Sequence, residues 1–367
     1  MSTSRDPGAS PPPAISGRKA DHIDLCIDGD VGFRGKSNLL HAVELVHDAL
    51  PELAVDEVDL TTPFAGRTLR APLIIAAMTG GVDRAEAINR DLAAVAEELG
   101  IGFAFGSQRP LLTEGITAGY RVRDVAPSTL VLGNIGIVQA RQAPTEALAE
   151  MVHESGADAL CVHLNPAMEV IQPEGDDDFR GGLDTIARLV AELPCPVIVK
   201  ETGCGLSRSV GQRVAALGVR QVDTSGAGGT SWVGVETRRA EHLRARLGET
   251  FWDWGIPTAA SVAQLSGLGL EICATGGLST GLDVARALAL GARCGGIARA
   301  FLQAHARGGR RAVRDVARTV IAEIRTALLL TGSRTPADLA RRPVVIAPPL
   351  AAWVPPDTPL ARRMLRG

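Results

Sequence analysis

The sequence predicts an α/β protein: a (β/α)8 TIM barrel preceded by an N-terminal extension. From Pro72 onward, short apolar runs bounded by Gly and Pro alternate with amphipathic helical stretches. Eight such units over about 250 residues match a closed parallel barrel. An open doubly wound sheet is the alternative, although no G-x-G-x-x-G motif opens the first unit. The expected strands are 72–77, 101–105, 129–134, 159–164, 196–200, 221–225, 271–276 and 295–298.

Composition narrows the class of protein. The chain has 367 residues, 46% of them hydrophobic, and a formal net charge of −3. The near-neutral charge argues against a nucleic-acid-binding protein, and no uncharged run approaches the roughly 18 residues of a membrane span. The six cysteines are scattered without a C-x-x-C pair, which indicates reduced thiols in a cytoplasmic protein.

The domain organisation is simple. Residues 1–16 are rich in Pro, Ser and Gly and lack an apolar signal core, so we interpret them as a disordered leader. Residues 17–367 are expected to form one domain that includes an N-terminal substrate-binding segment.

Polar or glycine-rich groups end seven of the eight expected strands. In a barrel these ends meet at one face, where active sites of this fold lie. Three adjacent glycine-rich turns, in SGAGGTS, TGGLSTG and GGIARA, can expose backbone N–H groups to a phosphate. The alternative is that the glycines only form tight turns. Taken together, the turns favour a phosphorylated cofactor.

Lys200 ends an otherwise apolar strand. A lysine in a barrel core is costly unless its charge is used. It can neutralise a reduced flavin, form a Schiff base with a substrate, or simply extend to solvent. The sequence leaves these three roles open.

An oxygen-rich cluster follows the fourth strand. Carboxylates and amides suit Mg²⁺, whereas Zn²⁺ is disfavoured because no second histidine or cysteine stands at ligand spacing. A merely solvated acidic loop is the alternative. The cluster consists of His163, Asn165, Glu169, Glu174 and Asp176.

A short basic segment precedes the barrel. Arg18, Lys19 and His22 lie in GRKADHI, and Arg109 lies in GSQR. Arginine binds phosphate through paired hydrogen bonds, so these residues together can hold a diphosphate. Solvated surface is the alternative.

Long motifs resemble the type 2 isopentenyl diphosphate isomerase family from about residue 17 to the C-terminus. They include RKADHI, APLIIAAMTGG, GSQR, GNIG, HLN followed by PEGD, PVIVKETGCGLS, VDTSGAGGTSWVGVE and ATGGLSTGLDVARALALGA. The resemblance implies a barrel that binds FMN and works with reduced flavin and Mg²⁺. It implies interconversion of isopentenyl and dimethylallyl diphosphate in isoprenoid biosynthesis, with NADPH serving only as reductant. It also implies a homo-oligomer, a tetramer or an octamer.

The resemblance assigns roles to matching positions. A prenyl diphosphate substrate is expected at Arg18, Lys19, His22, Ser107, Gln108 and Arg109, and Mg²⁺ at Glu169. The catalytic region is expected at His163, Asn165, Met168 and Lys200. FMN is expected to contact Met78, Thr79, Gly80, Ser107, Asn134, Lys200, Ser225, Thr230, Gly276, Gly277, Leu278 and Ala298.

The chain also departs from the family pattern. The family usually has HLN-x-x-QE, and here the glutamine position is Met168. A thioether can neither donate a proton nor organise a metal-bound water well. The sequence therefore predicts an isomerase, or a diverged relative acting on a prenyl diphosphate. Three smaller departures are Ala76-Ala77 for Ser-Ser, Arg299 for proline and Asp21 for glutamate.

Two other functions are compatible with such a barrel. An FMN-dependent 2-hydroxy-acid oxidase needs a base histidine in a His-Gly-x-Arg context after a late strand, and SGAGGTSW contains none. A flavin-binding remnant of reduced activity is the second alternative. The retained Lys200, Arg109 and Glu169 argue against it.

Overall fold

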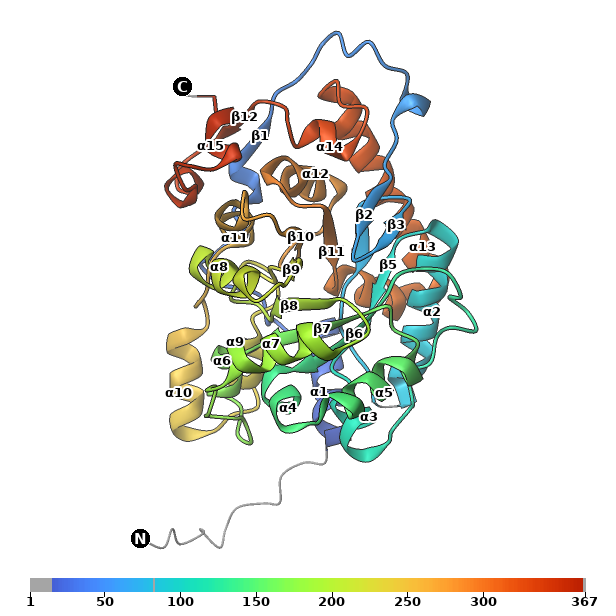
Figure 1. Ribbon diagram of the computed structural model, residues 1–367, viewed down its shortest axis with the longest axis vertical. Helices are drawn as coiled ribbons and strands as arrows, with labels where there is room; N and C mark the ends of the chain where they lie inside the picture. The colour runs from blue at the N-terminus through green and yellow to red at the C-terminus, as the bar shows by residue number, and fades with distance from the viewer. Residues whose placement is uncertain (1–14, 82, 366–367) are drawn as a thin grey trace, which may run out of the picture.

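The barrel predicted from the sequence is present. The structure is a computed structural model that describes residues 15–81 and 83–365, without the side chains of residues 15–20, 28 and 83. Eight parallel strands close in the order β10-β11-β4-β5-β6-β7-β8-β9 (Figure 1). They are β4 (Leu73–Ile75), β5 (Gly102–Ala104), β6 (Val131–Gly136), β7 (Ala159–Leu164), β8 (Val197–Glu201), β9 (Gln221–Asp223), β10 (Glu271–Ala274) and β11 (Cys294–Ile297).

Most of the barrel strands have no solvent-exposed face. Every residue of β4, β5, β6, β8, β9 and β11 is buried. Continuous apolar runs are typical of parallel strands that are covered on both sides. The barrel interior packs Ile74, Leu132 and Ile198 against Phe64. Phe64 belongs to a hairpin of β2 (Thr62–Phe64) and β3 (Arg67–Leu69), which therefore closes the N-terminal end of the barrel and was not predicted.

Helices surround the strands (Figure 1). The long α13 packs against both α2 and α12, and it contains a kink at Gly308 and Gly309. The helices that follow barrel strands are α2 (Asp83–Leu99), α3 (Arg109–Glu114), α4 (Ile137–Gln142), α5 (Thr145–Ser155), α6 (Pro166–Glu169), α7 (Gly182–Glu192), α8 (Arg208–Ala216), α9 (Trp232–Thr237), α10 (His242–Phe251), α11 (Thr258–Leu265), α12 (Gly281–Leu290) and α13 (Arg299–Leu330).

The N-terminal extension is helical where it meets the barrel. Helix α1 (Ile15–Asp28) includes the last two residues of the expected leader, and residues 1–14 lie outside the described part. Farther along, β1 (Val43–Leu45) pairs antiparallel with β12 (Val344–Ile346). This pairing joins the two ends of the domain. The remaining elements are η1 (Leu40–Ala42), η2 (Val55–Glu57), α14 (Pro336–Leu339), η3 (Leu350–Trp353) and α15 (Pro359–Arg363).

Two sequence-based expectations concern thiols and membranes. All six cysteines are free, as expected for reduced thiols. Among the described helices, none combines the length and the apolar character that crossing a bilayer requires.

Candidate active site

One cavity of about 580 Å³ lies where the barrel strands end. Residues that follow each of the eight strands line it, from Met78 after β4 to Ala298 after β11. Parallel strands in a closed barrel place their carboxyl ends at the same face. The polar strand ends singled out in the sequence therefore do meet.

Most of the predicted site residues line this cavity. Those that do are His22, Met78, Thr79, Gly80, Ser107, Arg109, Asn134, His163, Asn165, Met168, Glu169, Lys200, Ser225, Thr230, Gly276, Gly277, Leu278 and Ala298. Arg18 and Lys19 belong to α1, but their side chains are outside the described part of the structure. The roles of all these residues remain predictions, since placement alone does not establish them.

Gln108 is the exception: it does not line the cavity, and its contact with a diphosphate stays a prediction. Its side chain is fully buried, and Gln108 is absent from the cavity wall. The Gln108 side-chain oxygen accepts a hydrogen bond from the Asn134 N–H at 2.8 Å, and the Gln108 N–H donates to the Asn134 carbonyl at 2.7 Å. These two hydrogen bonds hold the Gln108 side chain against the backbone of Asn134 and away from the cavity wall. Gln108 therefore helps to position Asn134, which does line the cavity.

Lys200 is held in the barrel by Asp223. Its ammonium nitrogen lies 3.0 Å from a carboxylate oxygen of Asp223, and both side chains are 11% exposed. Burial alone would lower the pKa of Lys200, but the Asp223 carboxylate outweighs burial and holds the pKa above its ordinary value. Lys200 is therefore a cation at neutral pH. This state suits charge neutralisation and disfavours a Schiff base, which needs the free amine.

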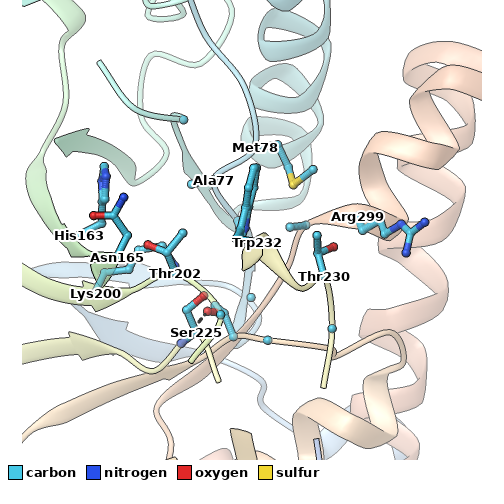
Figure 2. A pocket seen from close by; sticks show the side chains of 18 of the residues that line it. Ala77, Met78, His163, Asn165, Lys200, Thr202, Ser225, Thr230, Trp232 and Arg299 are labelled. Carbon is cyan, nitrogen blue, oxygen red and sulfur yellow. Dashed lines mark hydrogen bonds between the residues drawn. The ribbon is translucent and has the colours of Figure 1, made fainter. Parts of the chain in front are cut away.

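His163 is neutral. Burial first, and the nearby Lys200 cation second, lower the pKa of His163 to about 4. The Asn134 amide nitrogen donates to the Phe105 carbonyl at 3.1 Å, so the Asn134 amide oxygen is left to accept from His163 Nδ1 at 2.8 Å. This network assigns the proton to Nδ1. His163 Nε2 is then an acceptor at the cavity wall (Figure 2).

Glu169 is fixed by its neighbours. One carboxylate oxygen accepts from the Asn165 amide at 2.6 Å, and the other accepts from the Asp176 N–H at 2.9 Å. The Met168 sulfur lies 3.9 Å from the same Asn165 nitrogen. The position that would carry a glutamine in the family thus presents a thioether beside the only carboxylate on the cavity wall, as far as the described residues go.

Magnesium fits Glu169, although the rest of the predicted acidic cluster does not converge. Glu174 is exposed and absent from the cavity wall, and the Asp176 carboxylate accepts from the Gln139 amide at 3.0 Å. Within the described residues, no group of three His, Cys, Asp or Glu could hold a metal ion. Each carboxylate oxygen of Glu169 keeps a lone pair. Mg²⁺ commonly binds through one or two carboxylates, water and substrate phosphates.

The glycine-rich loops after β9 and β10 leave no room for side chains. A Cβ atom on Gly229 would overlap the backbone of Gly277, and one on Gly276 would overlap the backbone of Gly226. Gly276 and Gly277 also have φ angles of +108° and +79°, which favour glycine. The loops therefore expose backbone to the cavity. Such backbone N–H groups, beside the first turn of α13, fit a phosphate.

Unpaired polar atoms cluster at this cavity. Among the described residues, four buried side-chain atoms lack a hydrogen-bond partner: Thr79 Oγ1, Gln108 Nε2, Gln172 Nε2 and Thr202 Oγ1. Thr79, Gln172 and Thr202 line the cavity. Unpaired buried polar atoms destabilise a protein. With the Lys200 cation and the glycine-rich loops, they fit an anionic cofactor such as FMN.

Trp232 lines the cavity but was not predicted, because the contacts that hold it there come from a segment far away in sequence. His22 Nε2 lies 2.8 Å from a carboxylate oxygen of Glu236, and the His22 ring meets Trp232 edge-on at 5.3 Å between centroids. Glu236 is fully buried and also pairs with Arg239 at 2.7 Å. Hydrogen bonds from His22 and Arg239 outweigh burial and lower the pKa of Glu236. This buried carboxylate fixes α1 against α9.

Arg299, a departure from the family pattern, holds the other end of α1. Its guanidinium donates to the carbonyls of Cys26 at 2.8 Å and Gly29 at 2.6 Å, and Gln303 donates to the Ile27 carbonyl at 3.0 Å. The last carbonyls of a helix lack partners within the helix and attract cations. In Figure 2 the Arg299 side chain points away from His163 and Lys200. Arg299 thus anchors the helix that carries the predicted diphosphate residues.

Comparison with known proteins identifies the family. The chain is 43% identical over 337 residues to isopentenyl-diphosphate delta-isomerase of Methanosarcina mazei, covering 90% of this chain and 92% of that one. It is 44% identical over 336 residues to the Synechococcus protein of the same name, covering 90% and 96%. The chain belongs to the isopentenyl-diphosphate delta-isomerase family. It is therefore an isomerase, and residues 174–346 match the FMN-dependent dehydrogenase family.

Solved structures share the fold. A lactate oxidase of Pediococcus acidilactici is 16% identical with a TM-score of 0.66, covering 90% of this chain and 93% of that one. A flavocytochrome b2 with bound sulfite is 18% identical with a TM-score of 0.63, covering 90% and 82%. Identities this low show the barrel alone. They lend no support to the oxidase alternative.

Proposed function

We propose that this isomerase uses FMN and Mg²⁺ to interconvert isopentenyl and dimethylallyl diphosphate, with an active site modified at Met168. The observation that carries the proposal is the meeting of three features in one cavity: the Lys200 cation, the fixed Glu169 carboxylate and the glycine-rich loops. The names of the relatives point to the same substrate pair.

The polar end of the substrate is held by this chain's charges. Arg109 and His22 line the cavity, and Arg18 and Lys19 belong to α1, the helix that also carries His22. Glu169 would hold Mg²⁺ in contact with the diphosphate oxygens. Together these groups neutralise the diphosphate and orient the alkene.

FMN would rest on the glycine-rich loops, Thr79, Asn134 and Lys200. When bound and reduced, it supplies proton transfer at the alkene without net electron transfer. Lys200 provides the compensating positive charge, kept in place by Asp223. His163 stays neutral and offers Nε2 as an acceptor for a hydrogen of the substrate or of water. Ala76, Ala77 and Met78 form an apolar part of the cavity wall.

Met168 makes the catalytic wall less polar. Its thioether cannot donate a proton, and the Asn165 amide beside it is committed to Glu169. We therefore regard the chain as a diverged relative. It should isomerise isopentenyl diphosphate more slowly than family members that have the glutamine. It should prefer a prenyl diphosphate whose alkene is larger, or whose transition state carries more positive charge.

The test is anaerobic turnover of isopentenyl diphosphate with dithionite-reduced FMN and Mg²⁺, followed by proton NMR. We expect slow formation of dimethylallyl diphosphate by the native chain. Met168→Gln is expected to raise the rate about tenfold or more, because a positioned proton-handling group contributes at least that much. Met168→Leu, which keeps an apolar wall, is the matched control and should resemble the native chain.

The possible results separate the alternatives. Fast native turnover that is unchanged in Met168→Gln would remove the claim of divergence. No product from any C5 to C20 prenyl diphosphate, with the flavin retained, would support a flavin-binding remnant instead.

The proposal has three further parts. NADPH is the reductant of the flavin and takes no part in turnover. The chain works in the cytoplasm. It assembles as a homotetramer or octamer, which is supported by an exposed apolar stripe on and after α10 formed by Leu243, Leu247, Phe251 and Trp254.

A further inference from the structure

Gln172 carries a buried amide nitrogen that lacks a partner at the cavity wall. The residue is 1% exposed, and its Nε2 has no acceptor among the described residues. It nevertheless lines the cavity with Met168 and Glu169. An unpaired buried amide lowers the stability of the folded state, so a requirement other than folding has to account for it.

The backbone holds Gln172 firmly in this position. Its N–H donates to the Met168 carbonyl at 3.0 Å, and its carbonyl accepts from the Gly175 N–H at 3.0 Å. The Arg244 guanidinium donates to the same carbonyl. With its backbone anchored three times, Gln172 keeps its side chain at the cavity wall.

The neighbouring side chains do not provide an acceptor. The Met168 thioether accepts only weakly, and the Trp232 indole N–H is a donor. The Glu169 carboxylate oxygens accept from the Asn165 amide and the Asp176 N–H, and neither of them is paired with Gln172. A ligand bound in the cavity can supply the missing acceptor.

We propose that Gln172 is a substrate-binding residue whose amide donates a hydrogen bond to a phosphoryl oxygen of the diphosphate. The inference rests on the proposed function for the identity of the ligand. Phosphoryl oxygens are strong acceptors, and the same cavity presents Arg109, His22 and the predicted metal ligand Glu169. The chain thus keeps an amide one turn beyond position 168, where the family has its glutamine.

The test replaces the amide with an apolar group of similar shape, Gln172→Met. Because an unpaired buried amide is removed, the melting temperature of the ligand-free protein should stay the same or rise. The affinity for inorganic pyrophosphate with Mg²⁺, measured by calorimetry, should fall about tenfold or more because a charge-assisted hydrogen bond is lost.

Gln221→Met is the matched control. Gln221 is also a buried glutamine, but its amide donates to Glu271 at 3.0 Å at the opposite end of the barrel. This variant should lower the melting temperature and leave pyrophosphate affinity unchanged. A second variant, Gln172→Glu, replaces the donor with a negative charge and should weaken pyrophosphate binding further than Gln172→Met does.

Pyrophosphate affinity decides the proposal. If Gln172→Met and Gln172→Glu both bind within about twofold of the native chain, or if the native chain does not bind pyrophosphate, the proposal is overturned whatever the melting temperatures are. If the native chain binds pyrophosphate through Gln172 but converts no prenyl diphosphate, the proposed function is wrong and the inference about Gln172 still holds.

Discussion

Replacing Lys200 with methionine is expected to lower isomerase turnover about 100-fold or more, because the site loses its buried positive charge. The same change leaves the Asp223 carboxylate, 11% exposed, without its counter-ion. Removing one member of a buried ion pair costs about 3 kcal/mol or more in the free energy of unfolding. Turnover measures the first effect and urea denaturation measures the second, and the absorbance of bound flavin shows whether the cofactor is retained.

The double variant Lys200→Met with Asp223→Asn separates catalysis from stability. Asparagine keeps an oxygen for the Ser225 N–H and the Thr275 hydroxyl, which both bond to Asp223, while no buried charge remains. Much of the lost stability should return, and turnover should stay low. Recovery of turnover in the double variant would show that Lys200 acts only by balancing Asp223.

The second large effect is expected at Glu169. Glu169→Gln removes the charge that would bind Mg²⁺, and it places an amide against the Asn165 and Asp176 donors that Glu169 now accepts from. Replacing a residue that only hydrogen-bonds to a metal ligand already lowers metal affinity or activity about 10- to 100-fold. Turnover should therefore fall about 100-fold or more, with the Mg²⁺ concentration for half-maximal rate shifted upward.

Glu174→Gln is the matched control for that experiment. Glu174 lies in the same acidic segment but is exposed and does not line the cavity. Its replacement should leave the Mg²⁺ dependence as it is in the native chain. Equal effects of the two substitutions would mean that the segment acts through its total charge and that Glu169 is not a specific ligand.

The barrel and most of its catalytic face were predictable because the information is local. The barrel strands are largely apolar, and seven of the eight expected strands end in polar or glycine-rich groups that the fold places at the same face. Lys200 and Glu169 could be found in this way, since Lys200 lies near the end of β8 and Glu169 lies in the short helix α6 that follows β7.

Contacts between distant segments could not be predicted. The inward turn of Gln108 depends on Asn134 of the next strand, and the burial of Glu236 depends on His22, 214 residues earlier. The β1–β12 pairing joins the two ends of the domain. The sequence showed Arg299 as a departure from the family pattern. Its role could not be predicted, because it depends on the hydrogen bond that Arg299 donates to the Cys26 carbonyl of α1 in the folded protein.

The most direct test follows isopentenyl diphosphate in D₂O with the anaerobically reduced holoenzyme, recording the flavin spectrum and the deuterium content of the product. The proposed function predicts dimethylallyl diphosphate that carries solvent deuterium while the flavin remains reduced after many turnovers. Flavin that becomes oxidised in step with product, or product free of deuterium, would contradict proton transfer as the reaction of this cavity.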